Sequence, residues 1–176
     1  MIHKSLVVLG VMFIVMSCQQ EMSLQSYLVE KENDSSFISA SLSSNLIFQN
    51  LDTLSTELNT SLRKIKKVNL LALSKNKGGD NLANENDQLN AVLSNSEYDI
   101  LMQFNSSDRI AKLLYGGEDS NINDLILYGF DDQKGLLLLI MHGEDMNATD
   151  LYNISQSAQQ LNFDALPSGF ETILGE

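Results

Sequence analysis

The chain has 176 residues, with 23 Asp and Glu against 11 Lys and Arg, one Cys, one Pro and no Trp. A single Cys excludes an internal disulfide, a thiol redox pair and a cysteine-rich zinc site. The formal charge of −12 argues against nucleic acid as a partner, because binding its phosphates takes clustered Lys and Arg. An apolar content of 43% is too high for a disordered acidic tail, and the length fits one domain with its own core.

The first segment has the features of a bacterial lipoprotein signal peptide. Lys4 gives it a basic start, and an almost wholly apolar run follows over residues 6–16. That run suits the core of a signal peptide, since a membrane-spanning helix needs about 20 apolar residues. Ser17 directly before Cys18, with Val15 at the third place before the Cys, resembles a lipobox. There the Cys thiol accepts a diacylglyceryl group, and the small residue before it admits the signal peptidase.

This interpretation divides the chain into a signal peptide over 1–17, a lipidated tether over 18–22, one domain over 23–166 and a loosely ordered tail over 167–176. Acyl chains such as palmitate on the Cys then hold the protein on the membrane, because each buried CH₂ contributes about 0.8 kcal/mol. The alternatives are an ordinary signal peptide with a coincidental Cys, and a buried structural Cys.

The residues after the Cys bear on the location. Resemblance to lipoproteins of Gram-negative bacteria implies the outer membrane, because residue 19 is Gln rather than the Asp that retains some lipoproteins at the inner membrane. Only Glu21 is acidic just after Cys18, whereas surface-exported lipoproteins often carry an acidic run there. We therefore expect a lipid-anchored protein on the periplasmic face rather than on the cell surface.

The rest of the chain predicts alternating helices and strands. Apolar residues at helical spacing indicate helices, and strict alternation or a short continuous apolar run indicates strands. One long apolar stripe predicts a helix from Ile47 to Ile65, which Asp52 and Thr53 can divide because both are good N-caps. In chain order we expect a helix at 23–32, a strand at 36–42, that long helix, a strand at 68–74, a loop at 75–81, a helix at 82–95, strands at 98–105, 109–115, 122–130 and 136–142, and a helix at 147–161.

This order predicts an α+β fold. Four consecutive strands joined by short turns favour an antiparallel meander. The earlier strand–helix–strand unit can join the same sheet with its two strands parallel. We therefore predict a mixed, mainly antiparallel sheet with helices packed on one face. The continuous apolar run at 136–142 suits a strand that is buried on both faces.

Several of these segments together carry a family resemblance. They are the strand at 98–104, the hairpin that leads to 110–114, the strand at 124–128, and the run at 137–143 that ends in Gly143 before a helix; the helix-to-strand junction at 64–73 also fits. This pattern resembles an uncharacterised Bacteroidota lipoprotein family catalogued as domain of unknown function 4252. The resemblance implies a small secreted lipoprotein of unassigned function, and it supplies no catalytic residues.

Residues with reactive or metal-binding side chains are sparse. His142 is the only His after the signal peptide, and no Gly-x-Ser-x-Gly elbow exists for a triad, so we interpret it as a residue at a strand end. Asp145 and Asn147 have the spacing of a calcium loop without its Gly and closing Glu, and capping by Asn147 with Asp150 explains them better. We expect no metal ion and no cofactor. Three acids near the Gly78-Gly79 pair either bind a cation or form a solvated helix start: Asp80, Glu85 and Asp87.

A basic cluster ends the long predicted helix. Its members are Arg63, Lys64, Lys66 and Lys67. They form a candidate interaction patch for anionic lipid headgroups or an acidic partner. The alternative is that these cations compensate the helix dipole and keep the protein soluble.

The tripeptide Asp52-Thr53-Leu54 matches a short acceptor pattern for O-glycosylation in Bacteroidota. Thr53 is the candidate acceptor. A pattern of three residues is frequent by chance, and N-capping of a helix accounts for the same residues.

No single feature of the sequence identifies an activity. The absence of clustered His, Cys or acid–base groups favours a non-enzymatic envelope lipoprotein that binds another envelope protein, a glycan or a small ligand. One alternative is an accessory protein that contacts a membrane-bound signalling or stress regulator. A second is a glycan-active enzyme with paired carboxylates, whose spacing a sequence does not reveal.

Overall fold

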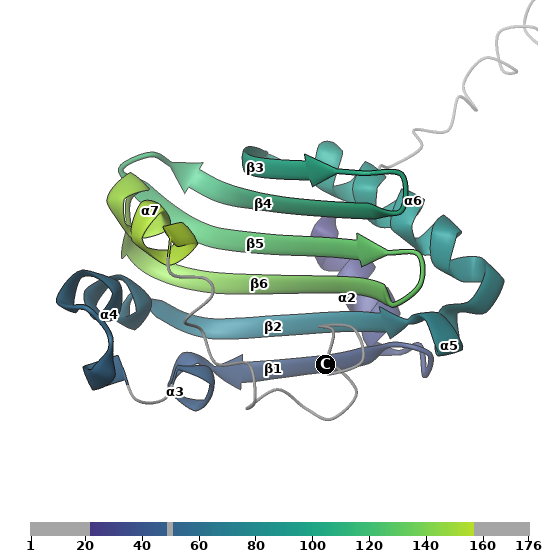
Figure 1. The fold of residues 1–176 in the computed structure, drawn as a ribbon, viewed down its shortest axis with the longest axis horizontal. Helices are drawn as coiled ribbons and strands as arrows, with labels where there is room; N and C mark the ends of the chain where they lie inside the picture. Colours follow the sequence, from purple (N-terminus) through teal and green to yellow (C-terminus); the bar gives the residue numbers. More distant parts are fainter. Residues whose placement is uncertain (1–21, 49–50, 157–176) are drawn as a thin grey trace, which may run out of the picture.

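The computed structural model describes residues 22–48 and 51–156. The described residues form one open six-stranded sheet in the order β1-β2-β6-β5-β4-β3, in which every neighbouring pair is antiparallel (Figure 1). The strands are β1 (Ile38–Ser43), β2 (Ile65–Ser74), β3 (Tyr98–Asn105), β4 (Arg109–Glu118), β5 (Asn121–Asp131) and β6 (Gly135–Met146). The helices are α2 (Leu24–Glu32), α3 (Ser44–Ile47), α4 (Thr56–Arg63), α5 (Lys75–Gly78), α6 (Leu82–Ser94) and α7 (Ala148–Gln156), with 3₁₀ turns η1 (Leu51–Thr53) and η2 (Gly79–Asn81).

The α+β class and the four-stranded meander are confirmed, and the structure corrects the direction of the first two strands. β1 and β2 are antiparallel, with Ser43 at the end of β1 opposite Lys67 near the start of β2. A parallel pair needs a connection that returns along the full length of the strands. The predicted long helix would have been long enough for that return, but α3 has 4 residues and α4 has 8. The chain therefore re-enters the sheet at the same end.

The helices cover both faces of the sheet, and not one face as predicted. In Figure 1, α4 and α7 lie in front of the sheet and α2 lies behind it. The physical reason is the apolar run of β6, whose side chains alternate between the two faces and need cover on each. Leu137, Leu139 and Met141 join the core under α3, α4 and α7, whereas Leu136, Leu138 and Ile140 join the core under α2 and α6.

The long predicted helix is only partly confirmed: α3 ends at Ile47, where that helix was expected to begin, α4 spans Thr56–Arg63, and Ile65 already begins β2. α4 begins after Ser55, whose hydroxyl accepts a hydrogen bond from the backbone N–H of Leu58 at 3.3 Å. Asp52 and Thr53, the predicted caps, lie in η1 instead. Because the two helices are separate, Leu58 and Leu62 of α4 point into the core, and α3 packs independently against β1 and β2.

The predicted cap of the last helix is confirmed. The side-chain oxygen of Asn147 accepts hydrogen bonds from the backbone N–H groups of Thr149 and Asp150 at 2.9 and 3.2 Å. Asp150 in turn accepts from the backbone N–H of Asn147 at 2.9 Å, which completes a reciprocal capping box. These contacts account for both residues without a calcium ion.

Several predicted segments lie outside the described residues. They are the signal peptide, the tether apart from its residue 22, and the whole of 157–176, which includes the predicted tail. Among the helices that are described, none is both long and apolar enough to cross a bilayer.

Candidate functional site

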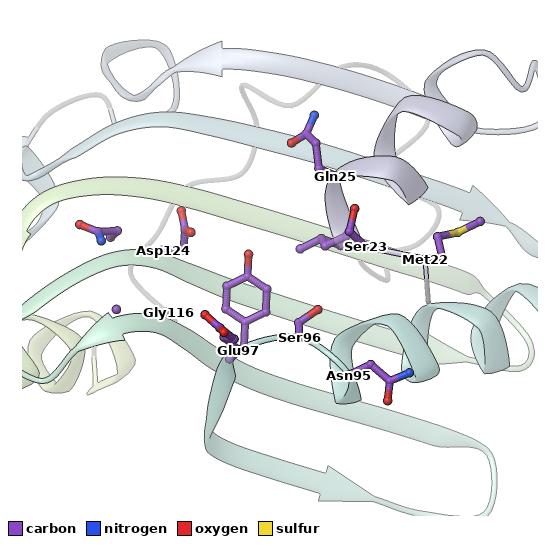
Figure 2. A pocket seen from close by; sticks show the side chains of 12 residues that line it. Met22, Ser23, Gln25, Asn95, Ser96, Glu97, Gly116 and Asp124 are labelled. Atoms are coloured by element: carbon purple, nitrogen blue, oxygen red, sulfur yellow. The ribbon is translucent and has the colours of Figure 1, made fainter. Parts of the chain in front are cut away.

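A polar pocket of about 600 Å³ lies on the side of the sheet that α2 and α6 cover. Figure 2 shows it between the first turn of α2, which carries Ser23 and Gln25, the segment after α6 with Ser96 and Glu97, and the strand that carries Asp124. Eight of the twelve lining residues have polar side chains, and none is basic. The lining consists of Met22, Ser23, Leu24, Gln25, Asn95, Ser96, Glu97, Tyr98, Gly116, Gly117, Asn123 and Asp124.

Glycine at one position of β4 makes room for the aromatic residue of the pocket. Tyr98 begins β3 and lies opposite Gly116 in the register of β3 and β4. A Cβ at Gly116 would lie 2.6 Å from Cε1 of Tyr98, closer than real Cβ atoms approach other atoms. The Tyr98 ring therefore takes the space that a side chain on β4 would fill, and it becomes part of the pocket wall.

Asp124 is the acidic residue of the pocket with the most extensive polar contacts. Its Oδ1 lies 2.7 Å from Nδ1 of His142 on β6. The other ring nitrogen of His142, Nε2, lies 3.0 Å from the amide nitrogen of Asn69 on β2, and the Asn69 oxygen accepts from Ser41 on β1 at 2.8 Å. This polar row crosses four neighbouring strands, β5, β6, β2 and β1.

The hydrogen bonds of this polar row determine which ring nitrogen of His142 carries the proton. The amide nitrogen of Asn69 can only donate, so Nε2 accepts, and Nδ1 carries the proton that is donated to Asp124. Both ring nitrogens are engaged within the sheet. His142 lies within β6 and not at a strand end as predicted. There it orients Asp124 at the pocket, and neither ring nitrogen is free for a general-base step.

The pocket combines neutral hydrogen-bond donors with two carboxylates. Burial raises the pKa of Tyr98, and the negative charge of Asp124 raises it further. The Tyr98 hydroxyl is therefore protonated at neutral pH and can donate a hydrogen bond. Glu97 and Asp124 contribute negative charge and acceptors, and the amides of Gln25 and Asn95 can both donate and accept.

The predicted basic patch lies where α4 ends and β2 begins, and much of it is engaged within the chain. Three of the four cations form ion pairs with N–O distances of 3.5, 2.7 and 3.9 Å: Arg63 with Asp52, Lys64 with Asp150, and Lys66 with Glu144. Lys67 is exposed and forms no ion pair with the described residues. The pairing of Lys64 ties α4 to α7, whereas the use of the patch by a partner stays a prediction.

The other predicted site residues are not among those that line the pocket. Cys18 is outside the described residues, and Thr53 lies in η1, so lipidation and glycosylation stay predictions. Glu85, one of the acids considered for a cation, is buried and paired with Lys31 at 2.9 Å. Within residues 22–48 and 51–156, no three His, Cys, Asp or Glu side chains are grouped so that they could hold a metal ion.

Sequence reasoning missed the pocket as a site. Its residues come from the start of α2, the turn after α6 and three strands, and no motif joins them. The sequence predicts a strand at 109–115 that stops just before Gly116. The role of Gly116 depends on the register that sets it opposite Tyr98, and neither segment alone reveals that register.

Comparison with known proteins places the chain in a family. No curated protein and no solved structure matches it. The model of one family, described as a domain of unknown function (DUF4252), matches residues 27–154. That range runs from the first turn of α2 to α7 and covers the whole described sheet. The chain therefore belongs to the DUF4252 family.

Proposed function

We propose that the protein is a lipid-anchored envelope protein that binds a small polyhydroxylated ligand, such as a neutral glycan, without chemical turnover. The observation that carries this proposal is the lining of the pocket at the start of α2. Carboxylates, amides and hydroxyls gather there around the ring of Tyr98 in a volume of about 600 Å³.

The chemistry of the lining favours hydroxyl-rich ligands. Each sugar hydroxyl is both a donor and an acceptor, and it pairs with carboxylate oxygens, side-chain amides and protonated hydroxyls such as that of Tyr98. An aromatic ring with an apolar face complements the C–H surface of a sugar. Two carboxylates without a basic residue in the lining disfavour anionic ligands by like-charge repulsion.

The proposed anchor lies near the pocket in the chain. Cys18 is four residues before Met22, which lines the pocket, and four extended residues span at most about 14 Å. A lipid on Cys18 therefore keeps the pocket close to the bilayer. We propose the periplasmic face of the outer membrane as the site of attachment, in agreement with the residues that follow Cys18.

One observation favours a second candidate, a glycan-active enzyme. Glu97 and Asp124 line the same pocket, and most enzymes that cleave glycosidic bonds use a pair of carboxyl groups. His142 already engages Oδ1 of Asp124 at 2.7 Å, and this fixed contact suits a group that positions a ligand. Product analysis after incubation with a glycan separates the two candidates.

The binding proposal is tested by calorimetric titration of the mature chain in detergent with cellobiose, maltose and N,N′-diacetylchitobiose. We expect at least one of these neutral disaccharides to bind intact, and Glu97→Gln to weaken that binding about tenfold, as for a hydrogen bond to a charged group. Glu57→Gln is the matched control, because Glu57 is exposed on α4 across the sheet. Failure of all three sugars to bind, or equal effects of the two substitutions, contradicts the proposal.

The anchor is tested separately. In cells fed labelled palmitate, the natural chain should carry the label and sediment with membranes, and Cys18→Ala should lose both properties. A Cys18→Ala protein that still takes up palmitate and stays with the membrane would rule out lipidation at this residue.

A further inference from the structure

The free edge formed by β3 exposes apolar side chains. Residues 99–105 of this eight-residue strand are all exposed. Four of the seven large hydrophobic residues that are exposed in the described part of the chain lie on it, with exposed fractions between 42% and 59%: Ile100, Leu101, Met102 and Phe104. Asp99 is its one charged residue. Protein sheets commonly protect their edges with charges, Pro or β-bulges, and this strand has one charge, no Pro and one register shift, between Ile100 and Met102.

The opposite edge of the sheet shows the contrast. The exposed positions of β1 are Ser39, Ser41 and Ser43, and its partly buried positions pack inward against the core. Figure 1 shows β1 and β3 as the two borders of the same sheet. The polar edge is typical of a strand that faces water, and the apolar edge is typical of a strand that meets another protein surface.

Two side chains of β3 also border an apolar groove. Met102 lies opposite Leu113 and Phe104 lies opposite Ala111, so both point to the face that α4 and α7 cover. There they line a groove of about 250 Å³ that ends at Ile154 of α7. The extra residue Leu101 between Ile100 and Met102 shifts the register and sends Met102 to this face.

The pattern of β3 fits a second copy of the same strand. In an antiparallel pair about a two-fold axis, residues directly opposite each other lie on the same face of the sheet. An axis through Gln103 sets Met102 of each copy opposite Phe104 of the other. The four side chains then form one apolar cluster, and Phe104 of each copy lies beside the groove of the other.

The acidic beginning of β3 favours an antiparallel over a parallel arrangement. Glu97 and Asp99 supply this negative charge. After the turn at the end of β3, Arg109 forms ion pairs with Asp108 at 3.8 Å and with Asp131 at 3.0 Å, so its charge is compensated within the chain. Antiparallel alignment places the two acidic beginnings at opposite ends of the strand pair. A parallel alignment would set like charges side by side.

From these observations we infer that β3 is the interface of a symmetric dimer, in which the two sheets join edge to edge through antiparallel β3 strands. Main-chain hydrogen bonds across the new pair provide affinity, and the apolar cluster sets the register. The charge of −12 on each chain opposes association, so salt strengthens the dimer by screening at a Debye length of about 10 Å in 0.1 M salt.

The register is tested by cross-linking in a mature chain whose only other thiol has been removed by Cys18→Ala. With an axis through residue 103, Gln103→Cys sets two Cβ atoms about 5 Å apart, and oxidation gives a disulfide-linked dimer. Asn105→Cys is the matched control, because its two copies lie about 13 Å apart along the strands. Equal cross-linking at both positions, or none at residue 103, overturns the inference.

Sedimentation of the same Cys18→Ala chain tests the interface without a cross-link. We expect a dimer whose dissociation constant falls as salt rises, and Phe104→Lys should weaken it by about tenfold or more. Tyr152→Lys is the control, because Tyr152 is also an exposed aromatic residue but belongs to α7 and does not line the groove. Circular dichroism confirms that both variants are folded. A monomer at every salt concentration, or equal effects of the two substitutions, contradicts the proposed dimer.

Discussion

The charged side chain of Lys31 is buried in the core on the α2 side of the sheet. Its side chain is 6% exposed, and its ammonium lies 2.9 Å from Oε2 of Glu85 and over the rings of Tyr27 and Phe37. Burial alone lowers the pKa of Lys31, but hydrogen bonds to Glu85 and Glu30 outweigh burial and raise it above its ordinary value. The pair joins α2 to α6, and each charge depends on the other for compensation.

Glu85→Gln should therefore destabilise the fold by about 3–5 kcal/mol, because it removes the buried counter-charge of the ammonium and leaves only the exposed Glu30 beside it. The measurement is urea unfolding at pH 7. Glu30→Gln is the control, since Glu30 lies 3.1 Å from the same ammonium but is 54% exposed, and its loss should cost less than about 1 kcal/mol. Similar losses for the two variants would show that the Lys31–Glu85 pair does not support the core.

The contacts of Asp150 lead to a second prediction, on how the stability of the fold depends on acidic pH. Burial raises its pKa, but hydrogen bonds from Lys64, the Asn147 backbone and Ser61 together lower it below the ordinary value of 3.8. Because the folded pKa is below the unfolded one, the stabilisation is present above about pH 4 and is lost as pH falls through the folded pKa.

Asp150→Asn should cost about 2 kcal/mol at pH 7, the effect of a hydrogen bond to a charged group, and should flatten the decrease in stability below pH 4. Urea midpoints between pH 2 and pH 7 measure both effects. Asp52→Asn, at an exposed ion pair with Arg63, is the control and should follow the natural chain. If Asp150→Asn loses stability below pH 4 as steeply as the natural chain does, the proposed contribution of Asp150 is wrong.

At the scale of the elements, local signals predicted the strands well. The predicted strand at 98–105 coincides with β3, and the four-stranded meander follows from short turns between strands. The direction of β2 and the placement of β2 beside β6 were not predictable in the same way, because they depend on contacts between residues far apart in the chain. The two-sided burial of residues 136–141 was visible in the sequence, yet which helices cover each face was not.

The same distinction applies to the candidate site. Ser23 was predicted near the start of a helix and Tyr98 at the start of a strand, and both positions are confirmed. Their meeting in one pocket, and the contact of Asp124 with His142, follow from register across the sheet. Without a reactive motif, the sequence does not indicate that these residues come together in one pocket.

The turn between β5 and β6 yields an element-scale prediction. Gly135 has φ of +140°, and a Cβ there would lie 2.2 Å from the carbonyl oxygen of Leu73 on β2. Gly135→Ala should destabilise the fold by about 3 kcal/mol or more through strain and displacement of β2. Thermal unfolding measures the loss.

Gly129→Ala is the matched control for Gly135→Ala. Gly129 lies in β5, and a Cβ added there meets nothing within 4 Å. We expect a change of less than about 1 kcal/mol in either direction. A loss at Gly129 as large as the loss at Gly135 would assign the effect to strands in general rather than to this turn.

At the scale of the whole molecule, the β3 end of the sheet brings together the features that bear on function. The polar pocket lies on the α2 and α6 side of the sheet, and the apolar groove lies on the α4 and α7 side. Tyr98, the first residue of β3, lines the pocket, and Met102 and Phe104 of the same strand line the groove. The proposed ligand pocket and the apolar cluster of the proposed dimer therefore lie on opposite faces of the sheet, at the same edge strand.

The central claim, that the pocket binds a neutral polyhydroxylated ligand, is tested most directly by mapping where the ligand binds. Backbone amide resonances of the isotope-labelled Cys18→Ala mature chain are recorded during titration with the disaccharide that binds best. The account predicts that the largest shifts occur at Ser96, Tyr98 and Gly117, with small shifts at Lys112 and Ser155 beside the groove. Shifts centred on the groove, or no localised shifts at saturating sugar, would contradict it.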